Sequence, residues 1–155
     1  MQLFQCQNCG HTLFFENTQC ERCGITLGFL PKHHTLSALL SQGDMYVALA
    51  DQSQGQWRFC ANHQHDVCNW LVDATSDSEY CCACELNRYI PNLDTGDQKG
   101  AWRELEFAKH RLVYSLLRFN LPLVSKAQNA ETGLSFDFVS EKDAVPAEAE
   151  TLTGH

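Results

Sequence analysis

Nine cysteines in a chain of 155 residues constrain this protein more than any other feature of its sequence. The most regular four form two C-x-x-C pairs, each followed by glycine, with ten residues between the pairs. Zinc prefers four soft ligands in a tetrahedron, and one tight turn can present both sulfurs of such a pair. Glycine after each pair tolerates a left-handed backbone that directs N–H groups at the sulfurs. The pattern predicts a structural zinc ion bound by Cys6, Cys9, Cys20 and Cys23. Iron suits the same motif but lies lower in the affinity order.

A second group of cysteines is less regular. Cys60 and Cys68 are too far apart for one turn but suit the two sides of a hairpin loop. Cys81 and Cys84 form the only C-x-x-C pair in this region, which leaves Cys82 as the spare. We therefore predict a second structural zinc ion, held by four cysteines of this group.

Spacing alone leaves two alternatives open for the second group. Cys82 is one candidate for inclusion in the ligand set, and replacement of a cysteine by His63 or His65 is the other. A spare cysteine beside a metal site is expected to be inert, because burial suppresses its thiolate form. His110 is expected on the wet face of a helix, away from any metal.

Charge and composition restrict the protein's partners. The formal net charge is −8, and two zinc ions with four thiolates each would bring it to roughly −12. Such an acidic surface disfavours binding to nucleic acid. No stretch reaches the ~18 apolar residues of a membrane span. The first residues lack the features of a secretory signal, and closely paired cysteines suit a reducing compartment, so we expect a cytoplasmic protein.

The elements expected from the pattern belong to a small α+β protein. Two β-rich, zinc-ribbon-like modules, at residues 1–30 (with rubredoxin-like cysteine turns) and 31–92, precede a helical region at 93–124 and a partly disordered tail at 125–155. Residues 45–50, 56–60 and 68–72 are typical of strands, and residues 133–139 form one more strand candidate.

One amphipathic helix is predicted over residues 101–119, ending before Pro122. Its apolar stripe is expected to pack on the second zinc module, with basic residues on the opposite face. The stripe comprises Trp102, Leu105, Ala108, Leu112, Leu116 and Phe119, widened by Val113 and Leu117, and the polar face comprises Arg103, Lys109, Arg111 and Arg118.

No sequence motif of a catalytic centre is present. The chain contains no H-E-x-x-H, no G-x-S-x-G and no glycine loop that cradles phosphate. Zinc with four cysteines is coordinatively closed, whereas catalytic zinc keeps a position open for water. The two predicted ions therefore stabilise the fold and do not hydrolyse a substrate.

Several segments resemble bacterial zinc-binding metallopeptidases that begin with a zinc ribbon. The resemblance covers nearly the whole chain and is strongest over residues 60–124, including CNWLV, the run from Tyr80 to Leu93 and the helix that begins WRELE. It extends through GLSFDF to LTGH. The resemblance implies Cys60, Cys68, Cys81 and Cys84 as the second ligand set, with Cys82 at a variable position. It also implies a catalytic helix downstream of His155, so residues 125–155 would begin a truncated peptidase domain or form a flexible tail.

Two classes of function follow from these observations. The first is the zinc-binding amino-terminal region of a zinc-dependent metallopeptidase, which positions a substrate or partner and is inactive alone; its partner would be the peptidase domain. The second is a zinc-ribbon module that binds protein or nucleic acid, with Trp57, Arg58, Phe59 and Trp70 as the nucleic-acid contacts. An electron carrier like rubredoxin would need iron in the first site.

Overall fold

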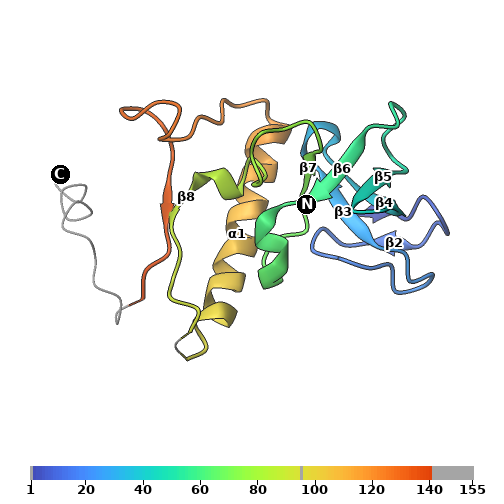
Figure 1. Cartoon of the computed structure of the whole chain (residues 1–155), viewed down its shortest axis with the longest axis horizontal. Helices are drawn as coiled ribbons and strands as arrows, with labels where there is room; N and C mark the ends of the chain where they lie inside the picture. Colours follow the sequence, from blue (N-terminus) through green and yellow to red (C-terminus); the bar gives the residue numbers. More distant parts are fainter. Residues whose placement is uncertain (1, 95, 141–155) are drawn as a thin grey trace.

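The computed structural model describes residues 2–94 and 96–140. The α+β class is confirmed: most of the short strands precede a single long helix in the described chain (Figure 1). The strands are β1 Phe4–Gln5, β2 Thr12–Leu13, β3 Leu27–Leu30, β4 Thr35–Gln42, β5 Met45–Ala48, β6 Gln56–Phe59, β7 Leu71–Asp73, β8 Asn87–Tyr89 and β9 Phe136–Asp137. The helices are η1 Pro31–His33, η2 Ala61–His65, η3 Cys84–Leu86 and α1 Gln98–Arg118.

Five strands form the main sheet, in the order β3-β4-β5-β6-β7, and every neighbouring pair is antiparallel. The strands expected near residues 45–50, 56–60 and 68–72 correspond to β5, β6 and β7. Gly43 opens the two-residue loop between β4 and β5 with φ +63°, a conformation that glycine adopts without strain. The predicted boundary between the two modules lies between residues 30 and 31. Strand β3 precedes this boundary and the other four strands follow it, so one sheet joins the segments that carry the two cysteine groups.

The sheet curls until its first and last strands meet. Phe29 of β3 bridges to Trp70, and the Phe29 N–H donates to the Asn69 carbonyl at 2.8 Å. A Cβ atom at Gly28 would lie 2.7 Å from the Leu71 side chain, so only glycine allows this approach. The sheet encloses a small apolar cluster of Leu30, Leu39, Ala48, Trp57 and Leu71.

A larger core lies between the sheet, both cysteine groups and α1. Aromatic rings form its centre: Phe29 lies 5.0 Å from Phe15, 4.7 Å from Trp70 and 5.9 Å from Tyr114 of the helix, as ring-centroid distances. Because one continuous core holds both cysteine groups and α1, the order of each depends on the others.

Helix α1 matches the bounds expected from the sequence to within about three residues, but the expected faces are wrong in part. Trp102 and Val113 are buried as predicted. Leu105, Leu112 and Phe119 are 53%, 46% and 75% exposed, although they belong to the stripe predicted to be buried. The prediction that Lys109 and His110 face solvent is also wrong, since each is 3% exposed. The residues buried on α1 are Trp102, Glu106, Lys109, His110, Val113 and Tyr114.

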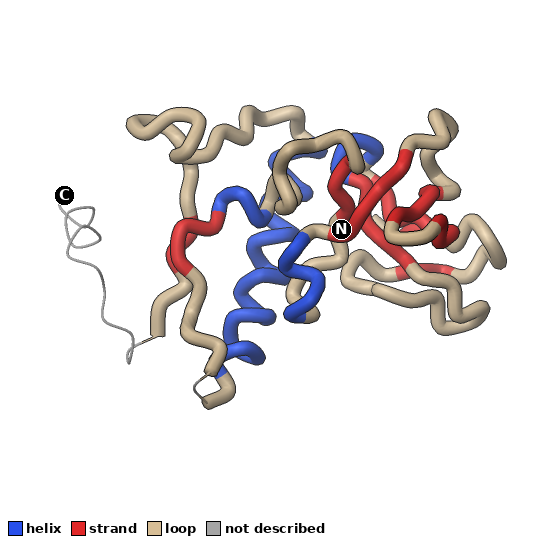
Figure 2. Tube along the Cα trace, in the orientation of Figure 1, coloured by secondary structure: helices blue, strands red, loops and turns tan. Residues whose placement is uncertain are grey.

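Strands β8 and β9 form a parallel pair, and Figures 1 and 2 show β8 across α1 from the main sheet. The strand candidate at 133–139 therefore corresponds to β9. Of the tail predicted at 125–155 as partly disordered, residues 125–140 are described and include β9, whereas residues 141–155 lie outside the described chain. Among the described helices, none has both the length and the apolar character needed to cross a bilayer.

We predict that Gly28→Ala lowers the free energy of unfolding by about 1–3 kcal/mol, because the added methyl overpacks against Leu71. Urea unfolding of zinc-saturated protein measures the change. Adding Leu71→Ala removes the obstructing side chain, so the double variant should lose less than the sum of the two single variants. Strictly additive losses would show that Leu71 is not the obstacle.

Candidate metal centres

The first cysteine group forms from two copies of one turn. The Gly10 N–H donates to the Cys6 carbonyl and the Gly24 N–H to the Cys20 carbonyl, each at 2.8 Å. Both glycines have positive φ, +71° and +73°, as the sequence pattern predicts. Each turn presents the two sulfurs of its pair on the same side.

The sulfur distances of this group fit a tetrahedral ion. Cys6 and Cys23 lie 3.8 Å apart and Cys9 and Cys20 lie 3.6 Å apart, measured between Sγ atoms. A zinc–sulfur bond of about 2.3 Å separates the sulfurs of a regular tetrahedron by about 3.8 Å. The hydrogen bond from the Asn8 side chain, followed by one from the Ile25 backbone, lowers the pKa of Cys23 to about 6. The Cys23 thiol is therefore mostly deprotonated at neutral pH before a metal binds.

The second group draws its four sulfurs from three segments. Cys60 directly follows β6, Cys68 precedes β7, Cys81 precedes η3, and Cys84 is the first residue of η3. All four residues are buried and their sulfurs cluster together, with Cys68 and Cys81 3.8 Å apart. Backbone N–H groups of Cys81 and Trp70 donate to Cys60 Sγ at 3.3 Å and to Cys68 Sγ at 3.4 Å. Both the spacing and the N–H donors fit a zinc–thiolate centre.

Electrostatics in the second group favour one thiolate before metal binds. Hydrogen bonds from Cys60, Cys68 and Cys81 hold the pKa of Cys84 well below its usual value. Burial raises the pKa of Cys68 and of Cys81 well above theirs. Metal binding must therefore displace protons from buried thiols, and its affinity falls as the pH falls.

The alternatives left open by spacing do not enter this group. Cys82 lies outside the cluster, and burial raises its pKa to about 12, which fits an inert thiol. His63 Nδ1 lies 2.8 Å from the Cys68 carbonyl oxygen while its ring stacks on Phe59. The His65 ring packs near Trp102. Among the described residues, neither histidine joins the four sulfurs.

His110 is the residue that sequence reasoning missed. Its Nε2 lies 3.8 Å from Cys84 Sγ, and its Nδ1 lies 2.6 Å from the Glu106 carbonyl oxygen. Periodicity hid it because His110 stands between Lys109 and Arg111 on a helix with a conventional apolar stripe elsewhere. Trp102 and Val113 are buried, and the positions between them on the same face of the helix are 106, 109 and 110. All three carry polar residues, which is the one unusual feature of the sequence here.

A buried ion pair lies beside His110. Lys109 Nζ lies 2.7 Å from Glu106 Oε2, and the Glu106 carboxylate is fully buried. Trp102 Nε1 and Asn87 Nδ2 donate to Glu106 Oε1 at 3.0 and 2.5 Å, and Lys109 also donates to Asn87 Oδ1. On its other side, the Lys109 ammonium lies 5.5 Å from the centroid of the Phe138 ring. The two buried charges of α1, on Glu106 and Lys109, are therefore paired with each other inside the protein.

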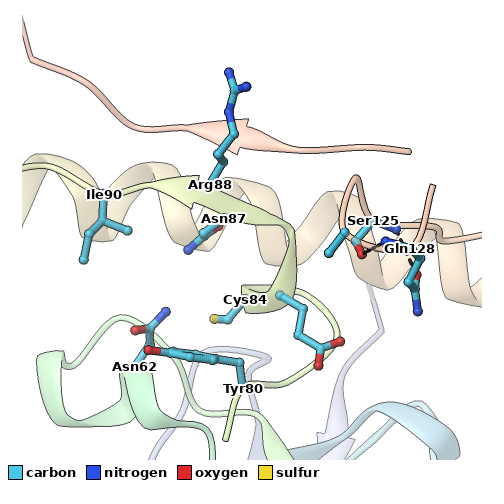
Figure 3. A pocket seen from close by; sticks show the side chains of 10 residues that line it. Asn62, Tyr80, Cys84, Asn87, Arg88, Ile90, Ser125 and Gln128 are labelled. Carbon is cyan, nitrogen blue, oxygen red and sulfur yellow. Dashed lines mark hydrogen bonds between the residues drawn. The ribbon is translucent and has the colours of Figure 1, made fainter. Parts of the chain in front are cut away.

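A cavity of about 480 Å³ adjoins the second cysteine group. Figure 3 shows Cys84 and Asn87 lining the same space as Asn62, while Ser125 and Gln128 contribute from the segment before β9. Tyr80, Glu85 and Arg88 also line the cavity, and among the described residues Cys84 is the one lining side chain that belongs to a candidate metal-binding group. The chemistry of this region is therefore that of the closed sulfur centre.

The residues expected to contact nucleic acid are not free to do so. Trp57 and Trp70 are 4% and 0% exposed, within the two apolar cores. Arg58 donates to the carbonyl oxygens of Ala74, Ser76 and Ser78. Trp57, Arg58 and Trp70 therefore do not form the expected stacking surface, and the half-buried Phe59 stacks on the His63 ring.

Comparison with known proteins agrees with the resemblance found in the sequence. Residues 3–95 match the family model of a zinc-ribbon domain, and residues 98–155 match the family described as "Putative zinc-binding metallo-peptidase". Uncharacterized proteins from Mycobacterium bovis and Mycobacterium tuberculosis are 33% identical to this chain over 156 residues. The match covers 100% of this chain and 40% of each relative. No solved structure matches the chain.

Neighbouring cysteines provide a matched test of the second ligand set. We predict that Cys82→Ala retains two zinc ions per chain, whereas Cys81→Ala retains one full-affinity site, because only Cys81 lies in the sulfur cluster. Elemental analysis of dialysed protein measures both. Loss of a zinc ion from the Cys82 variant would show that the proposed ligand set is incorrect.

We predict that Lys109→Met destabilises the zinc-loaded protein by about 3–5 kcal/mol, because it leaves the Glu106 carboxylate buried without its cation. Adding Glu106→Gln should recover much of the loss. Arg118→Met, at an exposed position of the same helix, is the control and should change stability by less than about 0.5 kcal/mol. Equal effects at Lys109 and Arg118 in denaturant unfolding would contradict the buried pair.

Proposed function

The chain belongs to the zinc-ribbon domain family, and we propose that it is the two-zinc, non-catalytic amino-terminal region of a zinc-dependent metallopeptidase. In this proposal its role is to hold the peptidase region in place, and with it a substrate or partner. The zinc ligands are Cys6, Cys9, Cys20 and Cys23 in the first centre and Cys60, Cys68, Cys81 and Cys84 in the second. Both sets supply four sulfurs, which leaves no coordination position for a reacting water.

The observation that carries the proposal is the position of α1 at the boundary between the two families. The match to the metallopeptidase family begins at residue 98, where α1 begins. The same helix packs on the second sulfur centre through His110 and on the aromatic core through Tyr114. The first element of the peptidase match is therefore fixed to the zinc module, as a positioning role requires.

A second observation supports an additional contact on α1. The exposed stripe of Leu105, Ala108, Leu112 and Phe119 recurs at three- and four-residue spacing, so its members share one face of the helix. An exposed apolar stripe of this kind is typical of a surface that another element covers. Because this chain spans 40% of its relatives' length, the remainder of a longer protein is the occupant that we propose.

Metal removal tests this role on the chain itself. We predict that chelation of both ions raises the amide exchange rates of α1 by at least about 100-fold, since structural zinc contributes on the order of 10 kcal/mol of apparent folding energy. Hydrogen exchange with mass spectrometry measures the change, and restored zinc should reverse it. If the amides of α1 exchange equally slowly with and without metal, the order of the helix does not depend on the zinc module, and the proposal is wrong.

Catalytic inactivity has its own measurement. The zinc-loaded chain should leave casein intact, because neither centre offers an open position. Zinc-dependent cleavage by the purified chain, abolished by chelation and absent from a Cys81→Ala preparation, would show instead that this region is an enzyme by itself.

A further inference from the structure

We propose that His110 is a reserve ligand of the second metal centre, which takes the coordination position of Cys84 when that thiolate is removed. The inference rests on the proposed function, because it requires a metal ion bound by the second cysteine group. It concerns a residue that lies outside both predicted ligand sets.

The position of the ring is the first argument. His110 Nε2 lies 3.8 Å from Cys84 Sγ. His110 does not belong to the compact set of four sulfurs, so with Cys84 present it lies beside the centre rather than in it. When the Cys84 side chain is truncated, the ring borders the vacated space, and a movement of the ring and the ion toward each other would bring Nε2 into the coordination shell.

The tautomer of the ring is the second argument. His110 Nδ1 lies 2.6 Å from the Glu106 carbonyl oxygen, which can only accept, so Nδ1 carries a hydrogen. A histidine that binds a metal through one nitrogen almost always donates the other N–H to a carbonyl or carboxylate. In addition, the Trp70 ring packs 5.1 Å from the His110 ring and orients it. Nε2 is therefore the nitrogen that faces the sulfur centre.

Neighbouring groups are engaged elsewhere, which singles out His110. Cys84, Glu106 and His110 lie close enough together to hold one ion. The Glu106 carboxylate, however, already accepts from Trp102 and Asn87 and pairs with Lys109. His63 directs Nδ1 at the Cys68 carbonyl and stacks on Phe59, with ring centroids 3.8 Å apart. His63 thus serves as a matched control: a histidine near the same centre whose ring is held in another direction.

Charge favours the exchange as well. A zinc ion with four thiolates carries about −2, and one with three thiolates and a neutral imidazole carries about −1. The buried Glu106 carboxylate nearby is paired with the buried Lys109 ammonium, so the thiolates carry the net negative charge of this region. Replacing a thiolate by imidazole therefore lowers the buried negative charge instead of leaving a coordination position empty.

Cobalt substitution provides the experiment, because the visible absorption of Co²⁺ reports its ligands and the first centre serves as an internal standard. The variants are Cys84→Ala, Cys84→Ala with His110→Ala, Cys84→Ala with His63→Ala, His110→Ala alone, and Cys60→Ala. Each full-length variant is loaded with Co²⁺, and the bound ions are counted and their spectra recorded.

The expected results distinguish a ligand from a merely adjacent residue. Cys84→Ala should bind two ions, one of them with bands at higher energy, as expected when nitrogen replaces sulfur. Adding His110→Ala should lower the affinity for that ion by more than the roughly 100-fold upper limit typical of a residue that only contacts a ligand. Adding His63→Ala should change little, and His110→Ala alone should retain two four-sulfur spectra. Cys60→Ala, whose sulfur is not in contact with His110, should lose the second ion.

Other outcomes would overturn the inference. If Cys84→Ala loses the second ion or fails to fold as Cys60→Ala does, His110 does not replace the cysteine. If Cys84→Ala keeps two ions whether or not His110 is present, another ligand takes the position. Either result leaves the proposed function intact, whereas wild-type protein that binds fewer than two ions would reject the two-centre proposal itself.

Discussion

Everything else in this structure depends on the clustering of eight sulfurs into two tetrahedral sets. The strands that carry them are short, with β1 and β2 only two residues long each, and such strands bury little apolar surface by themselves. The second set matters most for the arrangement, because its sulfurs come from three separate segments. A metal held by that set fixes the end of β6, the start of β7 and η3 with respect to one another, and these segments form the floor on which α1 lies.

The contact between that floor and α1 is polar at its centre, which is unusual for a helix packed on a small core. A carboxylate, an ammonium and an imidazole are buried side by side on α1, and each has a partner from another element. A buried pair of this kind is a weak source of net stability, but it strongly penalises a wrong arrangement, since any shift strands a charge. The registry of α1 on the zinc module therefore depends on Asn87, Cys84 and the rings of Phe136 and Phe138 together.

The sequence predicted the parts of the structure that obey local rules. C-x-x-C spacing and the following glycines gave the first centre, and periodicity with Pro122 gave the extent of α1 to within about three residues at either end. The buried face of α1 was wrong because the hydrophobic period assumes that apolar residues face the core. Here Glu106, Lys109 and His110 face it, and their partners Asn87, Phe138 and Cys84 lie 19–29 residues away in the chain. No local pattern encodes those pairings.

The misassigned stripe is itself informative about the architecture. A helix whose polar residues are buried and whose Leu105, Leu112 and Phe119 are exposed has two packing faces, not one. The first face is specified by charges and sulfur, and it fixes the angle and register of the helix on the zinc module. The second face is apolar and tolerant of different partners, because packing of leucine and phenylalanine demands less exact geometry than a buried ion pair. In the proposed function, a helix with these two faces transmits the rigidity of the zinc module to the element that packs on its outer stripe. The zinc-binding region would control the placement of the peptidase region in this way.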